Sequence, residues 1–568
     1  MGGWMGGMAG RMTGAAIALV LGAAAARAQS VTIAVDRTSF VPLASNFSGG
    51  NIASPDTPVE LGDPAVQAFV RPLQTGVTRW PGGKVDDYFL WDTGLIPPPA
   101  GSPTAKTRPG VPSPIDILQH VFSPYPDIKF NDEVAKAITK LQPILAGKGG
   151  NPLGDRDSGF GGFAGAIGAR FVTVVNATTD TVPSIERLAT TIARRHLPVV
   201  AFELVNEPYF LVVPASDGPI VLPPNAPPVP GAYADGGDYL TKVKPYRDAI
   251  KRGFQAAGMD PARAMVAIGA GFAADTSASN QRWMADLATY TQAHGAWWDG
   301  VVFHFYPPEY KGDAFSTKMK YANDALMIGT DPFIAAYRAA NFSAGKPLFV
   351  TEYDVTLNDR TIEGSVYGGV FCAEYIGRMS RYPETADVLL HELFSSSDGI
   401  GVPDTAIDGT GDWHQKLAAA GAAGQVLDTT GVIRGLFYTA QVLGVGIANA
   451  AVNASDRAYG TTVTGATGSV PTRSATLPAV FAQAYRGRDG TLHVLATNKG
   501  KEPKIAAIVV DGRALSSPVT VETLAPTSGD PAQSNSAASQ PIAVSRSTSQ
   551  GPVTLPGYSA SHIAFPAP

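Results

Sequence analysis

The 568-residue sequence has a single cysteine and few charged residues. The lone Cys372 excludes an intramolecular disulfide framework and a zinc site built on cysteines, and we expect a buried, unreactive thiol. Only 16% of the residues are charged, and a net charge of -5 gives no basic surface large enough to bind nucleic acid. The eight histidines form no zinc motif, and no glycine-rich phosphate loop occurs. The sequence therefore predicts no metal, no cofactor and no nucleic-acid partner.

Hydrophobic residues, in contrast, make up 45% of the chain. This content is enough for a sizeable core and excludes a largely disordered protein. The 62 glycines and 46 prolines, together with the low charge, indicate a loop-rich protein rather than a helical bundle.

The first 28 residues have the pattern of a secretory signal peptide. Arg11 precedes an apolar run from Ala15 to Ala25, and Ala26 and Ala28 are the small residues that a signal peptidase recognises. The run has about 11 residues, whereas a membrane span needs roughly 20. We expect cleavage before Gln29, a secreted or periplasmic protein, and no membrane association after cleavage.

From residue 44 to residue 449, short apolar runs alternate with helical patterns, as in parallel βα units. Strands are expected at Ala44–Phe47, Gly76–Trp80, Phe171–Val175, Val199–Leu204, Met265–Ile268, Gly300–Phe305, Leu348–Thr351 and Val388–Leu393. Such continuous apolar runs are typical of strands that are buried on both faces. Eight of them favour a (β/α)8 barrel, a TIM barrel of the α/β class, over an open doubly wound sheet.

Helical patterns separate these strands, and two long insertions interrupt them. Helices are expected at Pro183–Arg195, Asp238–Ala257, Asn280–His294, Lys318–Ala339, Ile362–Arg381 and Gly431–Leu443. The insertions, residues 97–155 and 212–237, follow strands and so belong on the C-terminal rim of the barrel. Loops there usually shape the substrate cleft, and the alternative is a disordered surface excursion.

The pattern changes after residue 449 to short alternating segments with turn signals. Residues 450–568 therefore predict a C-terminal β-sandwich domain. Its strands are expected at Ala479–Tyr485, Leu492–Asn498, Ile505–Val510, Val519–Leu524 and Ser559–Phe565. Residues 29–43 contain a further strand, Val31–Val35, which we expect to join this domain.

A glutamate follows or ends each of two expected barrel strands. Glu207 stands in Asn206-Glu207-Pro208, just after the fourth strand, and Glu352 comes directly after the apolar part of the seventh. The C-terminal ends of these two strands face one another across the mouth of the barrel. Two facing carboxyl groups suit glycoside hydrolysis, which needs one protonated and one ionised group. Either glutamate taken alone is equally consistent with a carboxylate that caps a loop.

The same residues carry a family resemblance. Asn206-Glu207-Pro208 and Glu352 resemble the acid/base and nucleophile of the large clan of retaining glycosidases that carry them on strands four and seven. The segment Thr78–Lys84, with Leu90–Asp92 after it, is similar to the Arg-Tyr-Pro-Gly-Gly segment of α-L-arabinofuranosidases, and heparanase-like β-glucuronidases carry a related one. The closing segment Val553–Ser559 resembles the end of their β-sandwich. The resemblance covers most of the chain and points to the clan rather than to one family.

The resemblance implies roles for four residues. Glu207 is the implied general acid/base and Glu352 the implied nucleophile. Asn206 is implied to bind the sugar 2-hydroxyl, a hydrogen bond that strengthens in the transition state. Arg79 is implied to lie under Glu352 and to keep its pKa low, because a nearby cation favours the carboxylate. Taken alone, Arg79 is also consistent with a structural ion pair.

His304 and Tyr306 end the sixth expected strand and match the His-x-Tyr of the clan, in which the tyrosine hydroxyl orients the nucleophile. Taken alone, His304 is also consistent with a core histidine. The eighth strand departs from the clan, which often ends it with a tryptophan under the sugar ring, whereas this chain has Leu390–Phe394. The floor of the -1 subsite is therefore expected to differ.

Aromatic residues lie at or just after the same strand ends. Because sugars stack their C-H faces on aromatic rings, we expect Trp80, Trp91, Tyr209 and Phe210 to be walls of sugar subsites. Asp87 follows the glycine turn and either contacts a sugar hydroxyl or caps its loop.

Together these features predict an exported retaining glycoside hydrolase that cleaves O-glycosidic bonds of an oligo- or polysaccharide substrate by double displacement. Two alternatives stay open: a carbohydrate-binding protein on a catalytically inactive barrel, and a transglycosylase that uses the same two carboxylates. Arabinofuranosides, glucuronides, xylan and β-glucan all stay open as substrates, as do exo and endo action.

Overall fold

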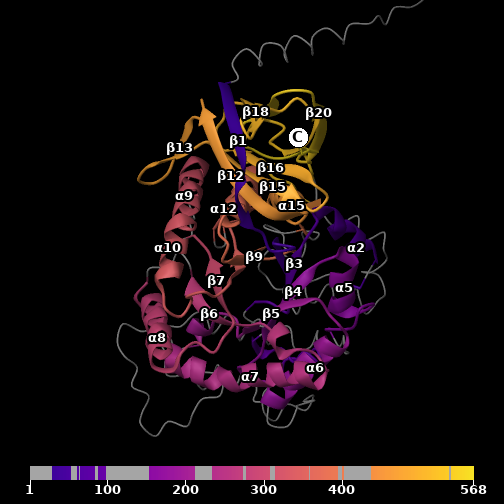
Figure 1. Ribbon diagram of the computed structural model, residues 1–568, viewed down its shortest axis with the longest axis vertical. Coiled ribbons are helices and arrows are strands. Elements are labelled where there is room, and N and C mark those ends of the chain that lie inside the picture. Colours follow the sequence, from indigo (N-terminus) through magenta and orange to yellow (C-terminus); the bar gives the residue numbers. More distant parts are fainter. Residues whose placement is uncertain are drawn as a thin grey trace, which may run out of the picture.

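The computed structural model describes residues 29–52, 61–62, 64–83, 87–97, 152–211, 233–272, 277–307, 314–356, 359–394, 400–401, 437–536 and 539–567. The expected signal peptide and most of both expected insertions lie outside these residues. The described chain forms a closed barrel and a β-rich domain, which are stacked along the long axis of the molecule (Figure 1). The predicted TIM barrel is confirmed, and a β-rich domain follows it where a β-sandwich was predicted.

The barrel consists of eight strands, and every neighbouring pair is parallel. In order around the barrel they are β2 (Ser48–Asn51), β3 (Val77–Trp80), β4 (Arg170–Val175), β5 (Val199–Leu204), β6 (Val266–Phe272), β7 (Gly300–Phe305), β8 (Leu348–Tyr353) and β9 (Thr385–Leu390). The barrel closes because β2 pairs with both β3 and β9.

The first barrel strand differs from the prediction. It was expected at Ala44–Phe47, but β2 is the glycine-containing segment Ser48–Asn51. Seven strands each contribute one apolar side chain to a common cluster in the core: Val77, Val172, Ala201, Ala267, Val302, Phe349 and Leu389. On β2, a Cβ added to Gly49 would lie only 1.9 Å from the carbonyl oxygen of Val77, so β2 has room only for glycine there. An apolar β-branched run, the signal of the other strands, is therefore excluded at this position.

Helices surround the barrel strands (Figure 1). They are α2 (Pro64–Val70), α5 (Gly159–Ile167), α6 (Val182–Arg194), α7 (Gly236–Ala256), α8 (Ala278–His294), α9 (Phe315–Ile328), α10 (Asp331–Ala339), α11 (Arg360–Glu363), α12 (Val366–Met379) and α15 (Ala440–Val452), with short 3-10 turns η1 (Arg71–Leu73), η3 (Pro208–Phe210) and η4 (Pro261–Arg263). Thr181, Asp235 and Ser277 cap α6, α7 and α8, since each side chain accepts a backbone N–H of the first turn.

Three helix predictions need correction. The helix expected at Lys318–Ala339 is two helices, α9 and α10, which Gly329 and Thr330 separate. A Cβ on Gly329 would lie 2.2 Å from the ring of Phe305, the last residue of β7. The break between the two helices therefore has room only for glycine at this position. The helix expected at Ile362–Arg381 divides into α11 and α12. The helix expected at Gly431–Leu443 begins instead at Ala440, where the Thr439 side chain accepts the N–H of Val442; residues 431–436 lie outside the described residues.

The β-rich domain is one ten-stranded sheet around its own apolar core. Its strands are β1 (Gln29–Pro42), β12 (Ser455–Gly465), β15 (Val480–Gly487), β16 (Thr491–Asn498), β17 (Lys504–Val510), β18 (Arg513–Ala514), β19 (Val519–Leu524), β20 (Ser545–Ser549), β21 (Val553–Leu555) and β22 (Ser559–Pro566). The N-terminal β1 pairs antiparallel with β12 and parallel with β17. Two short antiparallel pairs lie outside this sheet: β10 (Ile400–Gly401) with β11 (Phe437–Tyr438), and β13 (Ser469–Pro471) with β14 (Thr476–Pro478).

Helices α12 and α15 lie between the barrel and the β-rich domain (Figure 1). Nearly every side chain of both helices is buried. Their backbones approach closely at two glycines, because a Cβ on Gly444 would lie 2.0 Å from the carbonyl oxygen of Gly369. The expected domain boundary at residues 449/450 falls inside α15, so this helix belongs to the packing of both parts.

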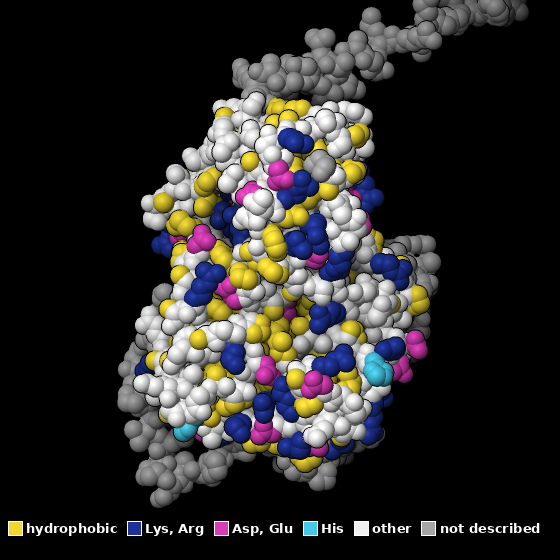
Figure 2. Space-filling model, viewed as in Figure 1, with side chains coloured by type: hydrophobic (Ala, Val, Ile, Leu, Met, Phe, Trp, Pro, Cys, Tyr) yellow, Lys and Arg dark blue, Asp and Glu magenta, His cyan; other side chains and the backbone are white. Residues whose placement is uncertain are grey.

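Among the described residues, no helix has both the length and the apolar character that a membrane crossing requires. On the face in Figure 2, Lys and Arg side chains are interspersed with Asp and Glu side chains. At the surface, Arg252 and Glu186 form one ion pair between the two kinds of charge.

Candidate active site

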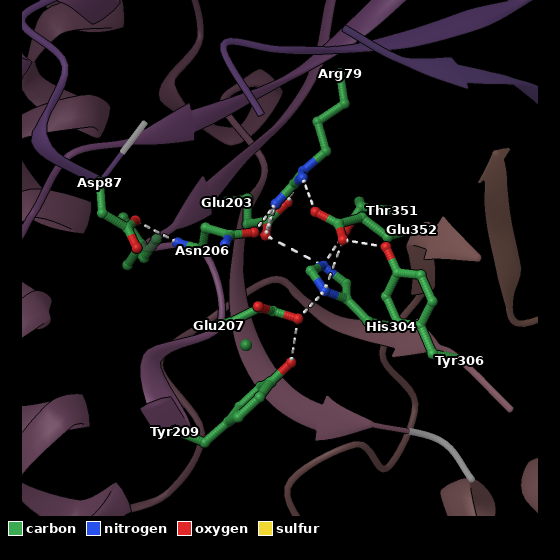
Figure 3. A network of polar contacts seen from close by, with 12 residues as sticks. Arg79, Asp87, Glu203, Asn206, Glu207, Tyr209, His304, Tyr306, Thr351 and Glu352 are labelled. Atoms are coloured by element: carbon green, nitrogen blue, oxygen red, sulfur yellow. Dashed lines mark hydrogen bonds and ion pairs between the residues drawn. The ribbon is translucent and has the colours of Figure 1, made fainter. Parts of the chain in front are cut away.

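Arg79 is at the centre of a polar network at the C-terminal ends of the barrel strands (Figure 3). It is fully buried, with 0% of its surface exposed. Its Nε and Nη2 donate to the two carboxylate oxygens of Glu203 on β5, at 2.8 and 2.7 Å. Nη1 donates to Oε1 of Glu352 at 2.6 Å, and Nη2 also donates to Oδ1 of Asn206 at 2.6 Å. Burial works against the guanidinium charge, but the two carboxylates outweigh it and raise the pKa of Arg79.

Glu352 lies on β8 with both carboxylate oxygens bound. Oε1 accepts from Arg79, and Oε2 accepts from the Tyr306 hydroxyl at 2.5 Å. Burial disfavours its charge, but His304, Arg79 and His391 favour the carboxylate and, with the Tyr306 hydroxyl, lower the pKa of Glu352 to about 2. The site therefore holds Glu352 ionised and in one orientation.

Glu207 lies on the turn that leaves β5, and its carboxylate points toward that of Glu352 (Figure 3). Its Oε1 is 2.9 Å from Nδ1 of His304 and accepts from the Tyr209 hydroxyl at 3.1 Å. His304 also lies 3.4 Å from Oε2 of Glu352 through the same nitrogen, while its Nε2 is 3.2 Å from the Thr351 hydroxyl. The imidazole therefore stands between the two glutamates.

The two glutamates are close together. One carboxylate oxygen of Glu207 and one of Glu352 lie within 4.8 Å of each other, and a ring nitrogen of His304 lies within the same distance of both. Three such groups are able to share a metal ion, but Arg79 already bonds Glu352 and its guanidinium repels a second cation. The donor set thus favours two carboxyl groups that act directly on a substrate.

The structure brings seven of the nine expected site residues into this network: Arg79, Asn206, Glu207, Tyr209, His304, Tyr306 and Glu352. Tyr209 joins it through its hydroxyl on Glu207 rather than as a bare ring face. Phe210 follows Tyr209 in the turn η3, with the two ring centroids 4.8 Å apart.

The other two expected site residues, Trp80 and Trp91, make contacts outside this network, and their expected role as subsite walls stays a prediction. Trp80 is fully buried and stacks on Phe160 of α5, with ring centroids 5.5 Å apart. Successive side chains of a strand point to opposite faces, so when Arg79 enters the barrel Trp80 must point to the surrounding helices. Trp91 is also buried, and its indole N–H donates to the Ser184 hydroxyl at the start of α6.

The structure adds Glu203, Asp87 and His391 to this centre; of these, the sequence analysis had considered only Asp87, as a sugar contact or a loop cap. The sequence analysis did not name Glu203, yet a glutamate within the apolar strand Val199–Leu204 was the available signal of a buried partner for a cation. Asp87 accepts the backbone N–H of Asn206 at 2.6 Å. His391, after β9, packs edge-on against Tyr306 with ring centroids 5.6 Å apart, near the place where the clan often has a tryptophan.

No protein-family model matches the sequence, and no curated protein matches it. Solved structures do match the fold of this chain. They are glycoside hydrolases, among them arabinofuranosidases of family 51 and enzymes of family 44.

The chain is similar to the α-L-arabinofuranosidase from Thermotoga maritima, with a TM-score of 0.57, 15% identity, and coverage of 94% of this chain and 100% of that one. For the family 51 arabinofuranosidase from Xanthomonas axonopodis pv. citri the TM-score is 0.58, with 15% identity and coverage of 94% and 99%. A xyloglucanase of family 44 from Paenibacillus polymyxa matches with a TM-score of 0.52, 13% identity and coverage of 95% and 100%. At these identities the likeness establishes the fold: a TIM barrel followed by a β-rich domain.

Proposed function

We propose that the protein is a retaining glycoside hydrolase with Glu352 as the nucleophile and Glu207 as the general acid/base. The observation that carries this proposal is the separation of the two carboxyl groups, whose nearest oxygens lie within 4.8 Å. Retaining enzymes place their carboxyl groups about 5 to 5.5 Å apart, whereas inverting enzymes leave roughly 6.5 to 9.5 Å for a water molecule. The fold of the similar glycoside hydrolases supports the same class of reaction.

The first step forms a covalent glycosyl-enzyme. Oε2 or Oε1 of Glu352 attacks the anomeric carbon, the bond from that carbon to the leaving oxygen breaks, and Glu207 donates its proton to that oxygen. Glu352 suits the nucleophilic role because Arg79 and Tyr306 hold it ionised and oriented. In the second step Glu207 takes a proton from water, the water oxygen attacks the anomeric carbon, and the Glu352 carboxylate leaves.

Asn206 is the residue that we propose to bind the sugar 2-hydroxyl. Its Oδ1 accepts from Arg79 at 2.6 Å, which orients the amide. Its Nδ2 is buried and has no hydrogen-bond partner among the described residues. A buried donor without a partner is costly, so a substrate hydroxyl at this place would stabilise the complex.

The proposed substrate is an oligo- or polysaccharide, and the test is hydrolysis of a panel of aryl glycosides: α-L-arabinofuranoside, β-D-glucuronide, β-D-xyloside and β-D-glucoside. NMR of the first product is expected to show the anomeric configuration of the substrate, and product analysis separates hydrolysis from transfer to a second sugar. Inverted product would contradict double displacement, and binding without turnover would leave a carbohydrate-binding protein.

Two variants assign the roles of the glutamates. Glu352→Ala is expected to lose turnover, and added azide should then yield the glycosyl azide of inverted configuration. Glu207→Ala is expected to lose about 10²- to 10⁴-fold in rate, and azide should yield the azide of retained configuration. Glu186→Ala, on the outer surface of α6 and paired with Arg252, is the matched control and should keep full activity.

We also propose that the protein is exported and that residues 1–28 are removed. The charged and apolar N-terminal pattern, with small residues at Ala26 and Ala28, supports this proposal. N-terminal sequencing of the protein from the culture medium or periplasm tests it, because a mature chain that starts far from Gln29 would contradict the expected site.

A further inference from the structure

The turn that carries Asn206 and Glu207 has an unusual backbone. Val205 has a φ of 68° and Glu207 a φ of 46°, so both residues that flank Asn206 are in the left-handed region. This region is disfavoured for residues other than glycine, and most of all for a β-branched residue such as Val205. Such a conformation persists only where neighbouring groups hold it.

Asp87 is a side chain that holds this turn. Its Oδ1 accepts the backbone N–H of Asn206 at 2.6 Å, between the two strained residues. Backbone hydrogen bonds hold the two ends of the turn. The N–H of Val205 donates to the carbonyl of Val175, and the N–H of Phe210 donates to the carbonyl of Glu207. The carboxylate of Asp87 thus holds the middle of the turn.

The two side chains that hold Asn206 come from one segment of the chain. Arg79 lies on β3 and binds the Asn206 side chain, while Asp87 follows eight residues later and binds the Asn206 backbone. Asp87 is only 3% exposed. Burial raises the pKa of Asp87 well above its usual range, although the Asn206 N–H and Arg79 oppose this shift, so a carboxyl group at this place is costly to the fold. A hydrophobic residue would avoid that cost but would not accept the N–H.

We infer that Asp87 is a positioning residue for Glu207, which keeps the turn strained so that the Glu207 carboxyl faces Glu352. This inference rests on the proposed function. Asp87 acts through Asn206 and not on the substrate. Without it the turn can relax, and Glu207 moves away from the leaving oxygen. Glu352 stays in place, because Arg79 and Tyr306 hold it independently.

The experiment uses aryl glycosides with leaving groups of different basicity. A 2,4-dinitrophenolate departs without protonation, whereas a 4-methoxyphenolate needs the proton of Glu207. For Asp87→Ala in the full chain, kcat/KM is expected to fall about 10²-fold with the methoxyphenyl glycoside and less than about 10-fold with the dinitrophenyl glycoside. Asp87→Asn keeps an oxygen that accepts the same N–H and should restore most of the lost rate.

The matched control is Asp260→Ala, because Asp260 also accepts a backbone N–H, that of Ala262 at 2.9 Å, but lies in the turn η4. It should leave both substrates unaffected. If Asp87→Ala fails to fold, Asp87→Glu keeps the carboxyl group and shifts it by one methylene, and it should show the same dependence on the leaving group.

Equal losses with both leaving groups, or no loss with either, would overturn the inference. An Asp87→Asn variant as impaired as Asp87→Ala would also overturn it, since the acceptor oxygen would then not be what matters. Failure of the proposed function has a different signature: Glu207→Ala itself would show no dependence on the leaving group.

Discussion

Arg79 and Glu352 form a buried ion pair, with Nη1 of Arg79 2.6 Å from Oε1 of Glu352 and side chains that are 0% and 5% exposed. The same guanidinium bonds Glu203, whose side chain is also fully buried. The Arg79 guanidinium therefore forms ion pairs with two carboxylates inside the barrel. The pair links the ionisation of the proposed nucleophile to the stability of the barrel.

Removal of the guanidinium should destabilise the whole chain. Arg79→Met leaves Glu203 and Glu352 buried without their cation, and such a loss typically costs about 3 to 5 kcal/mol in the free energy of unfolding. Urea denaturation measures the change. Arg187→Met is the control, because Arg187 is 56% exposed and lies 4.0 Å from Asp92, and it should change stability by less than about 1 kcal/mol. Similar small changes in both variants would contradict the prediction.

Stability should fall in acid through Glu352. The pKa of Glu352 is about 2 in the folded protein against an ordinary value of 4.5, since His304 and Arg79 outweigh the effect of burial. As the pH falls, the folded state therefore binds this proton at a lower pH than the unfolded state. The contribution of Glu352 to the free energy of unfolding is complete above about pH 4.5 and is lost as the pH falls toward 2. Unfolding free energies between these pH values should decrease less steeply for Glu352→Gln than for the wild type. Parallel pH curves would contradict the assignment.

A second buried ion pair joins the barrel to the β-rich domain. Nζ of Lys499 lies 2.5 Å from Oε2 of Glu374 on α12, and both side chains are 0% exposed. Lys499→Met alone should cost about 3 to 5 kcal/mol, because it leaves Glu374 with less charge compensation. The double variant Glu374→Leu/Lys499→Met should lose less than the sum of the two single variants in urea denaturation. Additive losses would show that the two groups do not depend on each other.

The contact between α12 and α15 should not tolerate a methyl group. A Cβ on Gly444 would lie 2.0 Å from the backbone oxygen of Gly369, so Gly444→Ala must push the helices apart and should cost about 1 to 3 kcal/mol or more. In Gly446→Ala, on the same helix, the new Cβ would lie 3.3 Å from Cδ2 of Leu73 and 3.8 Å from its Cα, the latter an ordinary contact distance. This control should leave the free energy of unfolding nearly unchanged, because the preference of alanine over glycine in a helix, about 1 kcal/mol, offsets the cost of the close contact. Thermal unfolding compares the two, and equal midpoints would contradict the close approach.

Much of the barrel could be predicted because strands that are buried on both faces leave a clear apolar pattern. Seven strands were found at or near their places, and β5 at its observed bounds of Val199–Leu204. The strand β2 was misplaced, because close packing at Gly49 requires glycine, and glycine carries no strand signal. The division between α9 and α10 depends likewise on a ring, Phe305, that is distant in the sequence.

The side-chain directions at the site were only partly predictable. The alternation along β3 would have sent Trp80 away from the barrel once Arg79 was placed inside it. Nothing local to Asp87, however, shows that its carboxylate meets the backbone of Asn206, 119 residues further along the chain.

Residue types and their order along the chain were therefore enough to specify a barrel, a β-rich domain, and two glutamates at the ends of facing strands. These features follow from local hydrophobic periodicity and from the rule that parallel strands share one carboxyl edge. The contacts of Arg79 with Glu203 and Glu352, and that of Asp87 with the turn, arose only when the barrel closed. They join strands and loops more than 100 residues apart, and no local pattern encodes a distance between such residues.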